Sequence, residues 1–140
     1  PRGVLGIEPN LTARERMAAH HIPHCDTMEK AIMDYHSFDH VITILTLEHV
    51  GNPWVLVHSA RMLMREDSTL HVVVPVLNLD LAWTGLHYTA DFFRNVHRWY
   101  FTPQSLQALL VSQRFEVIAS EIWTREENHH QYLYMGARVV

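Results

Sequence analysis

Short apolar runs alternate with helix-forming segments along most of this chain of 140 residues. We expect strands at Val4–Glu8, Ile22–Cys25, Phe38–Leu45 and Thr69–Pro75, with helices between them. Strands that alternate with helices predict an α/β domain with a mainly parallel sheet. Two later apolar runs, Phe115–Trp123 and Gln131–Val139, are joined by a short polar segment without a helix. They predict a C-terminal antiparallel hairpin.

The segments between these strands contain residues that favour helices and residues that cap them. The expected helices are Leu11–His21, Met28–Tyr35, Pro53–Met64 and Ser105–Gln113, and Thr12 and Thr102 are the expected caps. We expect Arg65–Ser68 to be a turn and Val76–Phe101 to be part helix and part loop. Because no linker or repeat interrupts this order, residues 1–140 are expected to form a single domain.

The composition excludes several classes of protein. Hydrophobic residues make up 48% and charged residues 19%, which predicts a globular chain. A net charge of −4 without a basic block disfavours nucleic acid as a partner, and no apolar stretch is long enough to span a membrane. The single cysteine, Cys25, excludes an internal disulfide and favours a cytoplasmic location. Because the sequence opens at Pro1, we expect a piece of a longer protein.

Glu8 ends the first expected strand and is the clearest candidate for binding a nucleotide. A carboxylate at the carboxyl end of a parallel strand has two acceptor oxygens for the two hydroxyls of a ribose. The alternative is an ordinary solvent-facing acid. A glycine-rich loop normally precedes such an acid by about 20 residues, and this sequence has no room for one before Glu8.

Four stretches, in this order, resemble the class I S-adenosylmethionine-dependent methyltransferases. They are Gly6–Pro9, Phe38–Val41 followed by Leu47–Val50, Ala60–Pro75, and Phe101–Val117. In that family they correspond to the acidic end of the second strand, the fourth strand with its loop, the helix and fifth strand, and the last helix with the sixth strand. The resemblance implies a Rossmann-like sheet, S-adenosylmethionine as cofactor, and methyl transfer to a small molecule, with a hydroxyl acceptor favoured.

The sequence departs from this family in two places. The family's first strand and its G-x-G-x-G loop are missing, and Glu66-Asp67-Ser68 replaces a Pro-Gly-Gly turn that supplies positive φ. The family's strand order, 3-2-1-4-5-7-6, places the missing strand between Val4–Glu8 and Phe38–Leu45. Either these two strands pair directly, or a missing N-terminal segment or another copy of the chain fills the gap.

These departures leave two functions open. One is a catalytic methyltransferase that binds its cofactor weakly as an isolated chain. The other is a degenerate, non-catalytic module that acts as an interaction surface. A third interpretation, a dinucleotide-dependent oxidoreductase, also uses an acid after the second strand, but the C-terminal hairpin argues against it.

The resemblance also assigns cofactor contacts beyond Glu8. Asp26 corresponds to an acid that accepts a hydrogen bond from the adenine amino group, and the backbone N–H of Thr27 to a donor to an adenine ring nitrogen. The alternative is that Asp26 and Thr27 cap the following helix. Leu47 lies in the loop that lines the methionine end of the cofactor in this family.

Candidate catalytic and substrate-binding residues lie in two segments. His49 follows a strand and could deprotonate a substrate hydroxyl, because imidazole titrates near neutral pH. The alternative is that Glu48 and His49 bond locally and shape the loop. His97 is a second catalytic candidate, and Arg98 is suited to a carboxylate or phosphate. Trp83 and Tyr100 would add an apolar wall, unless this segment is a lid helix packed on the core.

No metal is expected from the sequence. In ubiquinone-type O-methyltransferases a related Glu-x-x-Glu-His loop is linked to a divalent metal, but Leu45 stands in place of the first acid. His20 and His24 have the spacing of a helical metal pair, and Pro23 breaks the helix between them. A metal site needs three or four converging ligands, and no run of the sequence supplies them.

Overall fold

The computed structural model describes residues 3–35, 37–77, 96–125 and 130–140. Its elements, in chain order, are β1 (Gly6–Ile7), α1 (Leu11–Ala19), β2 (His24–Cys25), α2 (Met28–Asp34), β3 (Phe38–Ile44), α3 (Pro53–Met62), β4 (Met64–Pro75), α5 (Pro103–Ser112), β5 (Phe115–Thr124) and β6 (Gln131–Val139). This order confirms the predicted α/β class.

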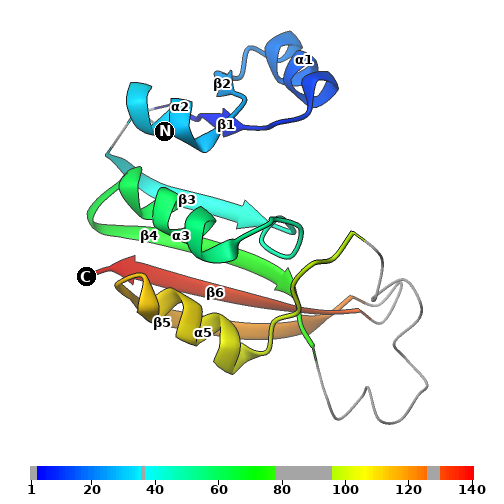
Figure 1. Ribbon diagram of the computed structural model, residues 1–140, viewed down its shortest axis with the longest axis vertical. Coiled ribbons are helices and arrows are strands. Elements are labelled where there is room, and N and C mark those ends of the chain that lie inside the picture. The colour runs from blue at the N-terminus through cyan, green and yellow to red at the C-terminus, as the bar shows by residue number, and fades with distance from the viewer. Residues whose placement is uncertain (1–2, 36, 78–95, 126–129) are drawn as a thin grey trace.

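The larger of two sheets has the strand order β3-β4-β6-β5 (Figure 1). β3 and β4 are parallel, whereas β6 is antiparallel to both of its neighbours. β6 is therefore the only strand of this sheet that runs in the opposite direction. The predicted C-terminal hairpin is confirmed, because β5 pairs with β6 from Phe115↔Val139 to Thr124↔Gln131.

β1 and β2 form a separate, parallel two-stranded sheet beyond the β3 edge of the larger one (Figure 1). No strand pairing joins β1 to β3 among the described residues. Direct pairing of these two strands, one of the alternatives left open by the sequence, is therefore excluded for this part of the chain. The two-stranded unit contacts the rest of the domain through packing of α2 against α3.

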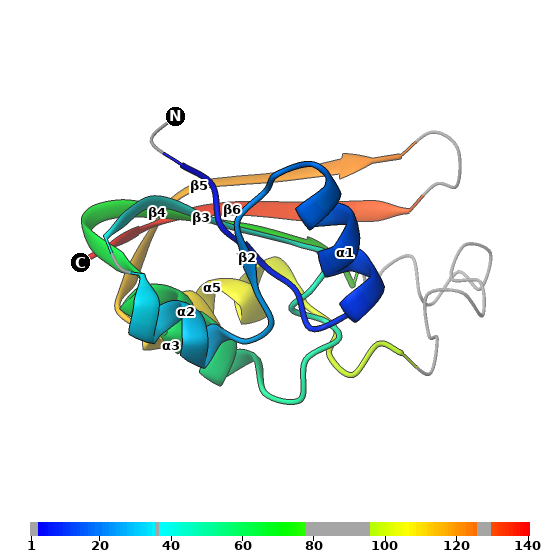
Figure 2. The same ribbon diagram turned by 90° about the horizontal axis from the view of Figure 1, so that it is seen from above.

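Helices α3 and α5 cover one face of the four-stranded sheet (Figure 2). Alternate residues of the central strands point into this layer, because successive side chains of a strand face opposite sides. The buried set includes Val72 and Val74 of β4, Leu133 and Met135 of β6, Val57 and Ala60 of α3, and Leu106, Leu109 and Leu110 of α5. This set forms the hydrophobic core.

The opposite face of this sheet carries no helix in the part of the chain that the structure describes (Figure 2). Ile42 and Ile44 of β3 are consequently 64% and 58% exposed. On the same face His71 Nδ1 lies 3.0 Å from the Tyr134 hydroxyl, and His71 Nε2 lies 3.3 Å from His40 Nδ1. Burial, with a contribution from the charge of His40, lowers the pKa of His71.

The prediction of a turn at Arg65–Ser68 is wrong, because these residues lie within β4. The pairing with β3 shifts register here, from Phe38↔Met64 to His40↔Thr69. Asp67 itself adopts φ 64°, in the left-handed region that Asp tolerates better than most residues. The backbone thus changes direction without glycine.

The cap and the end of α1 also differ from those expected. α1 is capped by Asn10, whose side chain accepts a hydrogen bond from the Ala13 amide, and not by Thr12. The same helix ends at Ala19, and His21 has φ 55°. By contrast, the predicted Thr102 cap is confirmed, with Thr102 and Ser105 forming a reciprocal capping box.

Much of the predicted helix-and-loop region Val76–Phe101 lies outside the described residues. At its ends, Val76 and Phe101 form a parallel bridge. None of the described helices is both long enough and apolar enough to cross a bilayer.

Candidate functional site

Several predicted site residues lie just after the carboxyl ends of β1, β2 and β3. Glu8 follows β1, Asp26 follows β2, and the loop that contains Leu47 and His49 follows β3. The carboxyl ends of parallel strands are where open α/β sheets bind ligands. Each of these residues is therefore at the edge of the fold where a ligand is expected.

The Glu8 carboxylate is held at the start of α1. Its Oε1 atom accepts a hydrogen bond of 2.8 Å from the Asn10 amide, and the Glu8 carbonyl accepts one from Arg14 Nη1. Glu8 is half-buried. Since a carboxylate has several lone pairs, this arrangement leaves acceptor capacity for a ligand.

Thr27 caps α2, as the alternative interpretation predicted, whereas Asp26 does not cap this helix and pairs with Lys30 instead. The Thr27 hydroxyl caps α2 by accepting from the Lys30 amide. The Asp26 carboxylate is 2.8 Å from Lys30 Nζ, and the hydrogen bond from Lys30 lowers the pKa of Asp26. A ligand contact at Asp26 would therefore use a carboxylate that is already paired with a lysine.

The loop after β3 is anchored to the core by Leu47. The Leu47 side chain is fully buried in the hydrophobic core. This burial leaves the backbone of Leu47 as the part that could face a ligand.

A segment 47 residues further along the chain packs on this loop. The backbone amides of Arg98 and Trp99 both donate to the Glu48 carbonyl, at 2.8 and 3.1 Å. The Trp99 indole N–H donates to the Val50 carbonyl at 3.0 Å. These hydrogen bonds bring His97, Arg98 and Tyr100 to the loop that carries His49.

The Nδ1 atom of His49 acts as a hydrogen-bond donor. It lies 2.9 Å from the Val96 carbonyl oxygen, which can only accept. In a hydrogen bond of this kind Nδ1 carries the proton, so Nε2 of the neutral ring holds a lone pair. The ring centroids of His49 and His97 are 4.8 Å apart.

Glu48, which was not among the predicted site residues, is the buried charge of this cluster. Only 3% of its side chain is exposed, and Oε1 lies 3.6 Å from His49 Nε2. Oε2 has no hydrogen-bond partner among the described residues. Burial raises the pKa of the Glu48 carboxyl, while His49 and His97 act in the opposite direction.

The remaining predicted residues surround this cluster. Arg98 is exposed, and a Cβ atom at Gly51 would lie 3.6 Å from its Nη1 atom. The Tyr100 ring centroid is 6.2 Å from that of His97. Trp83 lies outside the described residues. The structure thus brings His49, His97, Arg98 and Tyr100 together on one side, with Glu8 and Asp26 on the two-stranded sheet.

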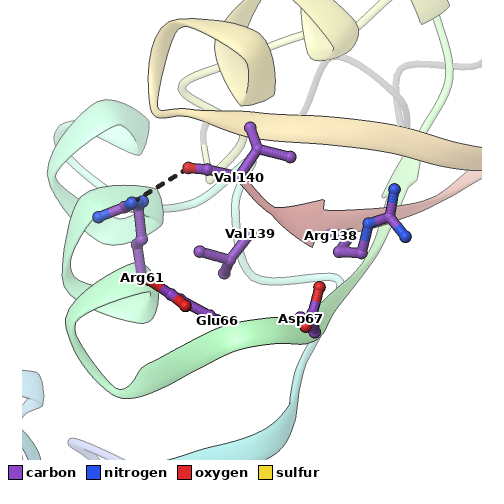
Figure 3. A pocket seen from close by; sticks show the side chains of 6 residues that line it. All are labelled: Arg61, Glu66, Asp67, Arg138, Val139 and Val140. Carbon is purple, nitrogen blue, oxygen red and sulfur yellow. Dashed lines mark hydrogen bonds between the residues drawn. The ribbon is translucent and has the colours of Figure 1, made fainter.

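A cavity of about 400 Å³ lies at the other end of the domain (Figure 3). It is lined by Arg61, Glu66, Asp67, Arg138, Val139 and Val140. Asp67 and Val139 belong to the amino end of β4 and the carboxyl end of the antiparallel β6. The cavity is therefore distant from the carboxyl ends of the parallel strands and does not include any predicted site residue.

A family model described as a methyltransferase domain matches residues 2–120. The chain belongs to this methyltransferase family. The match confirms the prediction of a probable S-adenosylmethionine-dependent methyltransferase, with a Rossmann-like fold. No curated protein matches the sequence.

Several solved structures with the same fold are methyltransferases of low sequence identity. An S-adenosylmethionine-dependent methyltransferase from Methanosarcina mazei is 16% identical, with a TM-score of 0.72 over 99% of this chain and 82% of the other. One from Mesorhizobium loti is 14% identical, with a TM-score of 0.73 over 97% and 80%.

The 1,6-didemethyltoxoflavin-N1-methyltransferase of Burkholderia thailandensis was solved with bound 1,6-didemethyltoxoflavin and S-adenosylhomocysteine. It is 19% identical, with a TM-score of 0.65, and the match covers 96% of this chain and 58% of the other.

The residues of this methyltransferase fit one half of S-adenosylmethionine. The half-buried Glu8 carboxylate and the Asp26 carboxylate end adjacent strands, β1 and β2. Such acceptors suit the hydroxyl and amino groups of an adenosine. The sequence contains no G-x-G-x-G loop for close backbone approach to the methionine half.

Proposed function

We propose that this methyltransferase transfers a methyl group from S-adenosylmethionine to a hydroxyl of a small molecule. The observation that supports a hydroxyl acceptor is the His49 ring, whose Nδ1 proton is directed to the Val96 carbonyl. That hydrogen bond leaves the Nε2 lone pair to accept a proton. The bound cofactor would supply an electrophilic methyl group. His49 Nε2 would accept the hydroxyl proton while the acceptor oxygen replaces the sulfur on the methyl carbon and S-adenosylhomocysteine leaves.

We assign the cofactor to the residues that follow β1, β2 and β3. Glu8 would accept from the ribose hydroxyls and Asp26 from the adenine amino group. The Thr27 amide would donate to an adenine ring nitrogen, and Leu47 would contribute backbone contacts at the methionine end. Displacement at the methyl carbon requires an in-line arrangement at near-attack distance, so positioning is the main task of these residues.

We assign the acceptor to the segment that packs on the His49 loop. His97 would assist His49, and the exposed Arg98 guanidinium would bind a carboxylate or phosphate of the acceptor. Tyr100 and Trp83 would provide an apolar wall. The unpaired Cys25 is in accord with the cytoplasmic location that we propose.

Titration with S-adenosylhomocysteine tests the cofactor assignment. We expect no strong calorimetric signal from the isolated chain, because the sequence has no glycine-rich loop. At millimolar ligand we expect amide NMR shifts confined to residues around Glu8, Asp26 and Leu47. Loss of charge in Glu8→Gln should weaken binding by about 10-fold or more, since a hydrogen bond to a charged group contributes roughly 1.5–3 kcal/mol.

The matched control is Glu29→Gln, which removes an exposed carboxylate in the first turn of α2. It should leave the shifts unchanged. Calorimetric binding in the micromolar range would contradict the expected weakness, and shifts that avoid the ends of β1 and β2 would contradict the placement of the adenosine.

A second function, a non-catalytic interaction module, is supported by the uncovered face of the larger sheet. Ile42 and Ile44 are more than half exposed there, and exposed apolar residues grouped on a sheet mark interaction surfaces. For this function we expect the chain to self-associate in a concentration-dependent manner.

Light scattering after size-exclusion chromatography measures this association. Ile42→Lys should shift the chain toward the monomer, whereas Val111→Lys, on an exposed position of α5, should not. A wild-type chain that stays monomeric at all concentrations would argue against the interaction module. If it also showed no adenosine contacts at Glu8, the result would argue against the methyltransferase function as well.

A further inference from the structure

We propose that Glu48, His49 and His97 bind one divalent transition-metal ion. One ligand atom from each of these three residues lies within 4.8 Å of the other two. No ion is needed to bring them together, because the hydrogen bonds of Arg98 and Trp99 to the Glu48 carbonyl already hold the two segments in contact. The inference goes beyond methyl transfer and does not depend on it.

The buried carboxylate is the first observation that supports an ion. Glu48 is 2% exposed, and its Oε2 atom lacks a hydrogen-bond partner among the described residues. A buried charge without compensation is costly, and buried charges are normally paired or coordinate metals. Among the described residues, this carboxylate makes an ionic contact with His49 Nε2 at 3.6 Å, which is too long for a hydrogen bond.

The orientation of His49 is the second observation. Histidine ligands almost always donate the other ring N–H to a carboxylate, a carbonyl or water, which fixes the tautomer and presents the ligating nitrogen. His49 Nδ1 makes this contact with the Val96 carbonyl at 2.9 Å. Its Nε2 atom, on the side of Glu48, is therefore already prepared to act as a ligand.

The spacing of the three groups is close to that of a bound site. Around a tetrahedral zinc ion with ligand distances of about 2.0–2.1 Å, donor atoms lie about 3.3 Å apart. His49 Nε2 and Glu48 Oε1 are at 3.6 Å, and the whole set is within 4.8 Å. Small rotations of these side chains would complete the site, with the remaining positions left to water or to the acceptor.

The donor set selects the class of metal. Two imidazoles and one carboxylate suit Zn²⁺, Co²⁺ or Fe²⁺. Mg²⁺ and Ca²⁺ prefer oxygen ligands throughout. A bound ion would occupy the His49 lone pair, so the base role proposed for His49 applies to the chain without the ion. With the ion bound, the metal would polarise the acceptor hydroxyl in its place.

Metal titration of the chelator-treated chain tests this site without cofactor or acceptor. We expect Zn²⁺ to bind as one equivalent by calorimetry, Co²⁺ to give visible d–d absorption that Zn²⁺ displaces, and Mg²⁺ to compete with neither. Glu48→Gln and His97→Ala should each weaken Zn²⁺ binding at least about 10-fold and reduce the Co²⁺ bands. Because Glu48 is buried and its variant could misfold, His97→Ala, at a half-exposed position, provides the independent comparison.

His58→Ala is the control, because His58 is an exposed histidine of α3 outside the cluster. It should bind Zn²⁺ like the wild type, which also controls for weak binding by other residues of a chain with twelve histidines. Zn²⁺ affinity that is unchanged in His97→Ala, or the absence of a saturable equivalent in the wild type, would overturn the proposal. Failure of methyl transfer would not affect this result, since no step of the test uses the cofactor.

Discussion

Leu110→Ala is expected to lower the free energy of unfolding by about 2–5 kcal/mol. Leu110 is fully buried on α5, which covers the β5–β6 side of the sheet. Removal of its side chain loses the transfer free energy and leaves a cavity that the surrounding helix and strands fill only in part. Since small domains are stable by only about 5–15 kcal/mol, this loss would be a large fraction of the total.

Urea denaturation measures the effect as a lower midpoint at unchanged slope. The neighbouring Val111→Ala provides the matched control, because Val111 is 55% exposed on the same helix and such surface changes usually stay within about 0.5 kcal/mol. A Leu110→Ala loss no larger than that of Val111→Ala would mean that α5 does not pack on the sheet as described.

His49→Ala is expected to reduce the rate of methyl transfer by about 10²–10⁴-fold, the range for loss of a general acid–base group. The substitution removes the Nε2 lone pair at the loop after β3. It also removes the hydrogen bond between the imidazole Nδ1 and the Val96 carbonyl. The measurement is the rate of S-adenosylhomocysteine formation with a panel of phenolic and aliphatic hydroxyl acceptors.

His58→Ala is again the control, and its rate should equal that of the wild type. A rate that is unchanged in His49→Ala would show that positioning alone drives the transfer and that the acceptor needs no base. If the metal site is occupied during turnover, the loss in His49→Ala should not be rescued by raising the pH, because a ligand has been lost.

Features that depend on local chemistry could be predicted from the sequence. The Thr102–Pro103 start of α5 and the β3 boundaries follow from a cap and from an apolar run. The extension of β4 through Arg65–Ser68 could not be predicted, because it depends on Asp67 at positive φ and on pairing of Met64 with the distant Phe38.

The same distinction holds for the candidate site. His49 could be selected because it follows a strand, whereas its contact with residues 96–100 arises from hydrogen bonds across 47 or more residues of sequence. Glu48 was overlooked as a site residue for this reason. Its neighbour Leu47 is apolar, but nothing local indicates that the carboxylate would be enclosed by a segment so far along the chain.

The separation of the two sheets affects the distance between the proposed cofactor site and the proposed acceptor site. Glu8 and Asp26 are attached to one sheet and His49 to the other, with no strand pairing between them in the described part of the chain. One intervening strand would set β1 and β3 about 10 Å apart. The segment that occupies this space would set the distance between the sugar of the donor and the oxygen of the acceptor. A change in the width of that segment would alter the alignment of the transferred carbon, even with both groups of side chains unchanged.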